Sequence, residues 1–168
     1  MAIVNEISAF ANDPALAAVV ARRRTAVVLM HNRGQSSDMY AEARYDDVAA
    51  DVARELQARA DVALAAGIPR EAIILDPGLG FAKRAEQTIE ALAGLDHIAA
   101  LGFPVLSGPS RKSFLKVGLG DVPPAERVWG TAAAVTASIL LGAHIIRVHD
   151  VREMVQVARV ADSIAGRT

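Results

Sequence analysis

Residue types suited to binding chemistry stand at the end of each short apolar run of this sequence. Runs of this kind are typical of buried parallel strands, whose carboxyl ends meet at one edge of a sheet. Polar residues that follow them therefore converge in space, although they lie far apart in the chain. In chain order these candidate residues are Asn5, His31, Arg33, Asp76, Ser110, Arg111, Lys112, Arg147 and His149.

The chemical types in this set indicate one flat heterocycle and at least one anion. A carboxylate and a carboxamide, such as Asp76 and Asn5, can pair with the donor and acceptor edge of a nitrogen-rich ring. Arg147 and His149 alternate along one predicted strand and so point to the same side, as two cations facing one anion must. Lys112 supplies a third positive charge.

Each candidate also has a purely structural interpretation. Asp76 precedes a proline and can be a turn-forming residue, and a lone histidine is more often structural than catalytic. Ser110 and Ser113 can cap helices, and Arg111 with Lys112 can be a solvated basic pair. The backbone amides of a helix that starts near Ser113 would, however, favour an anion. Coincidence at every strand end explains the whole pattern less well than a shared site.

The apolar periodicity predicts the elements that position these residues. Between the strands, apolar residues recur every three or four positions, as in amphipathic helices; one such helix spans 46–66, and another carries Ile89, Leu92 and Ile98. Five β-α units of this length favour a parallel α/β sheet with right-handed crossovers. The closure stays open between a doubly wound sheet and part of an eight-stranded TIM-type barrel. The predicted strands are 2–7, 26–30, 73–76, 103–106 and 144–148.

The composition narrows the class of protein. With 168 residues, 52% hydrophobic but only 4% aromatic, the sequence suits a single α/β domain. The formal net charge of -1 gives no reason to expect a nucleic-acid or membrane partner, and the lack of cysteine excludes disulfides and thiolate metal sites. We find no signal peptide, no membrane-length apolar run and no Walker or G-x-G-x-x-G fingerprint, so we expect a cytoplasmic protein.

At these strand ends the sequence resembles the dihydropteroate synthase family of folate biosynthesis. The segment 75–81 is similar to the family's D-P-G-x-G-F motif, 110–114 to its S-R-K-S-F loop and 146–151 to its R-V-H-D-V ending. Two earlier segments, 29–34 and 4–8, are similar to its L-M-H-M-R-G and N-D-I/V-S motifs. The resemblance covers essentially the whole chain in order.

The resemblance implies a transferase that condenses a (dihydropterin-6-yl)methyl diphosphate with 4-aminobenzoate, giving dihydropteroate and pyrophosphate. It assigns Asn5, Asp76 and Lys112 to the pterin, with Met30 and Gly108 lining the pterin pocket.

It also assigns Arg147 and His149 to the diphosphate. Ser113 would receive the carboxylate of 4-aminobenzoate, with Phe81 and Lys112 beside its ring. The implied catalytic residues are Asp76, Lys112, Arg147 and His149.

The resemblance further implies that the chain, one pterin-binding domain over 1–168, holds the last five of eight β-α units and is truncated at its amino-terminal side. The family's magnesium-binding asparagine lies in the earlier units, so no metal ligand is expected in this chain. Such a chain can be a truncated product, a late start or a half completed by another chain. A non-catalytic pterin-binding or assembly fragment is the alternative function, and a methyl-transferring pterin barrel is a more distant one. A homodimer through the carboxyl-terminal helices is also implied.

Overall fold

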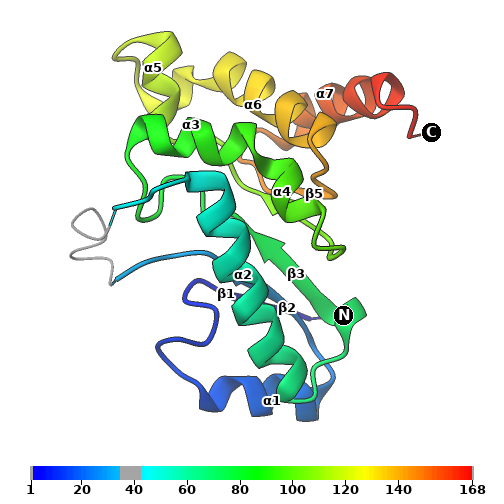
Figure 1. Cartoon of the computed structure of the whole chain (residues 1–168). Helices are drawn as coiled ribbons and strands as arrows, with labels where there is room; N and C mark the ends of the chain where they lie inside the picture. The colour runs from blue at the N-terminus through cyan, green and yellow to red at the C-terminus, as the bar shows by residue number, and fades with distance from the viewer. Residues whose placement is uncertain (1, 35–42, 168) are drawn as a thin grey trace.

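Short parallel strands alternate with helices along the chain in a computed structural model that describes residues 2–34 and 43–167 (Figure 1). The strand-then-helix order predicted from the sequence is confirmed. None of the helices in these ranges has the length and apolar content needed to cross a membrane. The elements are β1 (Ile3–Glu6), α1 (Ala15–Arg23), β2 (Ala26–Met30), α2 (Val48–Ala65), β3 (Ile73–Asp76), α3 (Ala85–Ala93), α4 (Leu95–Ala99), β4 (Leu106–Ser107), α5 (Lys116–Leu119), α6 (Val128–Leu140), β5 (Ile145–Ile146) and α7 (Val151–Ile164).

The strands lie side by side in chain order. β1 pairs with β2 and β2 with β3, and β4 pairs with β5, always in parallel. A bridge between Leu75 and Val105 joins the two groups, and the Leu75 N–H donates to the Pro104 carbonyl at 2.9 Å. The carboxyl ends of the strands therefore meet at one edge, as the sequence predicts.

The two faces of the sheet have different surroundings. Alternate residues such as Leu29 and Leu75 are fully buried in the main core, under helices that include α2 (Figure 1). The intervening residues Val28, Ile74 and Leu106 form a separate cluster of buried residues on the opposite face. We call this opposite face the inner face. Asn5 pairs in register with Val28, so it belongs to the inner face too.

Helix α2 forms where the amphipathic pattern predicts it. The Asp47 side chain caps its first turn by accepting from the Ala50 N–H at 2.9 Å. The whole predicted stripe faces the core, and burying a leucine such as Leu56 contributes about 1.5–3 kcal/mol. The helix ends before Gly67, which has a φ of +89°. The stripe consists of Val48, Val52, Leu56, Ala60 and Ala63.

The helix predicted after β3 differs from the structure. The helix expected to carry Ile89, Leu92 and Ile98 is divided at Gly94 into α3 and α4, and Ile89 is 39% exposed rather than buried. A Cβ on Gly94 would lie 2.3 Å from the Cβ of Ala49, so α2 approaches this point too closely for any side chain.

The fourth and fifth strands are also shorter than expected. The ladder of β4 begins late because Pro104, inside the predicted strand, has no backbone N–H to donate. Strand β5 comprises only Ile145–Ile146 rather than 144–148.

Candidate functional site

Asp76 ends β3 and is 8% exposed. Its Oδ1 accepts the Gly78 N–H at 2.8 Å, which shapes the turn that follows the strand. Burial raises the pKa of the Asp76 carboxyl, while the Gly78 hydrogen bond and the charges of Lys112 and Lys83 act in the opposite direction. Asp76 is thus a desolvated carboxyl group at the edge where the strands end.

The segment after Asp76, residues 77–81, we call the glycine turn. Gly78 has a φ of +63°, and a Cβ there would lie 2.0 Å from the carbonyl oxygen of His31. Only glycine fits this position, because the turn lies directly against the end of β2. The Phe81 N–H closes the turn by donating to the Gly78 carbonyl at 2.9 Å.

Lys112 reaches the glycine turn from the loop that follows β4. Its ammonium group donates to the Leu79 carbonyl and lies 4.8 Å from the centroid of the Phe81 ring. Burial lowers the pKa of Lys112, and the charge of Asp76 raises it. The structure therefore brings together Asp76, Phe81 and Lys112, three residues that the sequence predicted for one site.

Arg147, which directly follows β5, lies beside this group. Gly108 packs against Arg147, whose Cβ is 3.9 Å from the position that a Gly108 Cβ would take. The charge of Arg147 acts on both Asp76 and Lys112, lowering the pKa of each. Arg147 is exposed and, by strand alternation from the Leu106–Ile145 pair, lies on the inner face.

Ser110 holds His149 in place. Its Oγ accepts the His149 backbone N–H at 3.1 Å and lies 2.9 Å from His149 Nδ1. Ser110 is buried, whereas the adjacent Arg111 turns away to form an ion pair with Asp150. Ser110 thus contacts His149, whereas Arg111 pairs with Asp150, although both were predicted as strand-end candidates.

The remaining candidates occupy the same edge. Met30 pairs in register with Asp76 and is buried, and its Cγ is 3.4 Å from the position of a Gly78 Cβ. Asn5 is exposed on the inner face, level with Val28. Ser113 is exposed and begins a short 3-10 turn, so a helical segment starts there as predicted, with α5 following it.

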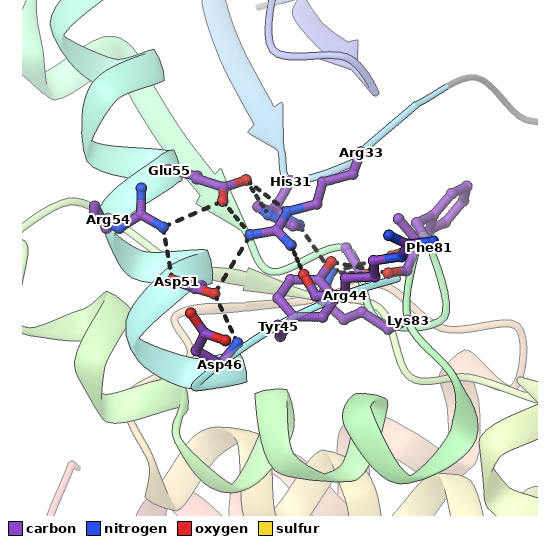
Figure 2. Close-up of polar contacts among 12 residues, drawn as sticks. His31, Arg33, Arg44, Tyr45, Asp46, Asp51, Arg54, Glu55, Phe81 and Lys83 are labelled. Atoms are coloured by element: carbon purple, nitrogen blue, oxygen red, sulfur yellow. Dashed lines mark hydrogen bonds and ion pairs between the residues drawn. The ribbon is translucent and has the colours of Figure 1, made fainter. Parts of the chain in front are cut away.

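Sequence reasoning missed a buried network beneath the glycine turn (Figure 2). Lys83 Nζ lies 2.9 Å from His31 Nδ1, and His31 Nε2 lies 3.1 Å from Glu55 Oε2. Arg33 pairs with the same carboxylate and stacks over the Tyr45 ring at 3.9 Å. His31 and Arg33 were candidates, but Lys83 has no apolar periodicity or motif that marks it as buried.

The described residues do not fit a magnesium site. Across 2–34 and 43–167, no three His, Cys, Asp or Glu side chains are grouped so that they could hold a metal ion. Asp76, the most buried acid of the site, is surrounded by the ammonium groups of Lys112 and Lys83. These positive charges therefore disfavour a divalent cation at Asp76.

Comparison with protein families and curated proteins gives a consistent result. The family described as "Pterin binding enzyme" matches residues 1–149. A dihydropteroate synthase from Synechocystis sp. is 44% identical over 162 residues, which are 96% of this chain and 56% of that protein. One from Bacillus subtilis is 38% identical, over 98% of this chain and 55% of that protein. The chain thus spans about half the length of the curated relatives it matches.

Solved structures match equally well. The dihydropteroate synthase from Thermus thermophilus in complex with 4-aminobenzoate superposes with a TM-score of 0.90 at 39% identity. That match covers 96% of this chain and 65% of the other. The Yersinia pestis enzyme in a sulfonamide drug complex superposes with a TM-score of 0.92 at 34% identity, covering 99% of this chain and 60% of the other.

Proposed function

This chain belongs to the pterin-binding enzyme family, and from that premise we propose that it carries the pterin and 4-aminobenzoate site of a dihydropteroate synthase. The observation that supports this most directly is the grouping of Asp76, Lys112 and Arg147 at one edge of the sheet, with His149 held there by Ser110. We further propose that β1–β5 are five consecutive strands of an eight-stranded barrel. Their parallel, chain-order arrangement supports that closure over a doubly wound sheet.

The pterin ring would bind on the inner face above Asp76. Because the Gly78 N–H engages Oδ1, the ring's donor edge would meet Oδ2. Asn5 would complete the polar edge, and Met30 and Gly108 would form the apolar and backbone walls. The ammonium group of Lys112 lies 4.8 Å from the centroid of the Phe81 ring and interacts with the charge of Asp76, so it would contact both substrates.

The proposed reaction breaks the bond between the pterin methylene carbon and the diphosphate oxygen, and the bonding electrons leave with pyrophosphate. The nitrogen lone pair of 4-aminobenzoate then forms the new C–N bond, and that nitrogen releases its extra proton to solvent water. Arg147 and His149 would stabilise the growing negative charge of the leaving group. Ser113 and Phe81 would hold the carboxylate and ring of the amine, which places its nitrogen for attack.

Helix α7 supports a proposed homodimer. On this helix Val151 and Val155 form one exposed apolar pair, and Val160 and Ile164 form another on the opposite side; they are 43–67% exposed, and a second copy would cover one of the two pairs. A monomeric mass by light scattering at micromolar concentration would contradict this part of the proposal.

The test of function uses the purified 168-residue chain, the pterin diphosphate and 4-aminobenzoate, with magnesium added. If the wild-type chain releases pyrophosphate and the Asp76→Asn variant does not, the result supports the proposed synthase activity. The alternative is a non-catalytic pterin-binding fragment. The observation that favours it is that the match covers only 56% of the Synechocystis relative. That alternative predicts calorimetric binding of a pterin without pyrophosphate release. A folded chain that binds neither substrate would refute both.

A further inference from the structure

Lys83 is a buried lysine that the proposed reaction does not use, and burial lowers its pKa to about 7. It lies between the glycine turn and α3, and only 2% of its surface is exposed. Burying an ammonium group is costly unless hydrogen bonds compensate it. A lysine in this position therefore needs a specific set of partners, and these partners show what it does.

Three acceptors surround the Lys83 ammonium group, which has three donors. It lies 3.1 Å from the Phe81 carbonyl oxygen and 2.9 Å from His31 Nδ1 (Figure 2). It also lies 3.2 Å from the Gly78 carbonyl oxygen. Gly78 and Phe81 are also the two residues whose backbone hydrogen bond closes the glycine turn. The ammonium group thus links the two residues that close the turn to His31, which directly follows β2.

The third acceptor is fixed by its own partner. Glu55 can only accept, so His31 donates its Nε2–H to that carboxylate and presents an unprotonated Nδ1 to Lys83. Burial lowers the pKa of His31 to about 4, which agrees with a neutral ring. Arg33 in turn holds Glu55 through its Nε at 3.2 Å. A continuous chain of contacts therefore runs from the turn to helix α2.

Lys112 meets the same turn through a different carbonyl. It donates to Leu79, while Lys83 donates to Gly78 and Phe81. The two lysines differ in exposure, because Lys112 is partly exposed and Lys83 is enclosed. Only Lys112 is therefore available to a ligand, and Lys83 acts through the backbone.

We propose that Lys83 is a positioning residue, whose ammonium group clamps the glycine turn against His31 and thereby sets where Asp76 and Phe81 meet the pterin and the aromatic amine. The ligand part of this inference rests on the proposed function, whereas the clamp itself does not. The experiments below separate the two.

The first experiment needs no variant of Lys83 and no ligand. The ring-nitrogen chemical shifts of ¹⁵N-labelled histidine distinguish the two neutral tautomers, and His31→Gln identifies the His31 signals. At pH 7 we expect His31 to be neutral, with the proton on Nε2. A proton on Nδ1 would overturn the clamp, because Lys83 would then have no acceptor there. This result stands even where substitution of Lys83 prevents folding.

The second experiment measures the turn in the Lys83→Met variant, which keeps the length of the side chain and removes the donors. We expect hydrogen exchange at the Gly78 and Phe81 amides to accelerate about tenfold or more, with α6 amides unchanged. Lys83→Gln restores donors and should recover part of the protection. The control is Lys116→Met, which removes an exposed lysine paired with Asp121. Unchanged exchange at the turn in folded Lys83→Met would refute the clamp.

The third experiment tests positioning by calorimetric titration with a pterin and with 4-aminobenzoate. Lys83→Met should weaken each by about tenfold, with Lys83→Gln intermediate and Lys116→Met unchanged. If hydrogen exchange at the turn accelerates in Lys83→Met but the affinities for the pterin and 4-aminobenzoate stay unchanged, Lys83 does not position the ligands. Failure of the wild-type chain to bind either compound would refute the proposed function instead, and the exchange and tautomer measurements would then decide the clamp.

Discussion

Replacing Asp76 by asparagine should separate binding from stability. The asparagine Oδ1 can still accept the Gly78 N–H, so the geometry of the glycine turn is preserved. What is lost is the negative charge that would pair with the pterin ring. A hydrogen bond to a charged group contributes about 1.5–3 kcal/mol, so pterin affinity should fall about 10- to 150-fold.

Stability should change in the other direction. Burial raises the pKa of Asp76 in the folded chain above its unfolded value, so keeping the carboxylate ionised above that unfolded pKa costs folding free energy. At pH 7 the neutral asparagine avoids this cost. The urea midpoint of Asp76→Asn should therefore equal or exceed that of the wild-type chain.

The assay pairs calorimetric titration of a pterin with urea unfolding on the same preparations. Asp96→Asn, at an exposed position in the first turn of α4, is the matched control and should alter neither measurement. Wild-type affinity in Asp76→Asn would refute its assignment to the pterin. A clearly lower urea midpoint would refute the argument that burial works against the ionised carboxylate.

Three further predictions concern stability. Gly78→Ala should lower the melting temperature, because the left-handed backbone alone costs about 1–2 kcal/mol and the new Cβ would meet the His31 carbonyl; unchanged melting would contradict the close approach. Asp47→Ala should cost about 1 kcal/mol in urea unfolding by removing the α2 cap, whereas Asp61→Ala, within the same helix, should cost less. The folded-state pKa of His31, about 4, lies below the ordinary 6.5, so the unfolded chain binds more protons between these values and stability should rise with pH across them. The gain from pH 5 to pH 7 should be about 2 kcal/mol, and an equal gain in His31→Gln would refute the assignment to His31.

Local patterns predicted those parts of the fold that depend on neighbouring residues. The α2 stripe follows from a helical repeat, and the end of β3 from an apolar run that stops at Asp76 and Pro77. Parallel strands then bring Asp76 and Arg147 to one edge of the sheet, although the two residues lie far apart in the sequence.

Other features depend on partners that are distant in the chain. Lys83 is buried because His31, 52 positions earlier, presents an acceptor to it. Gly94, where α3 and α4 divide, lies against Ala49 of another helix. Neither contact leaves a periodic trace, so the apolar pattern alone predicted one continuous helix and gave no sign of the buried lysine.

Main-chain atoms hold the glycine turn, so its shape does not depend on the identity of the side chain at position 81. Lys83 contacts the Phe81 carbonyl and Gly78 receives the Phe81 amide proton, so neither contact involves the Phe81 ring. The ring itself is only partly buried. Substitutions at position 81 should therefore leave the backbone of the glycine turn unchanged.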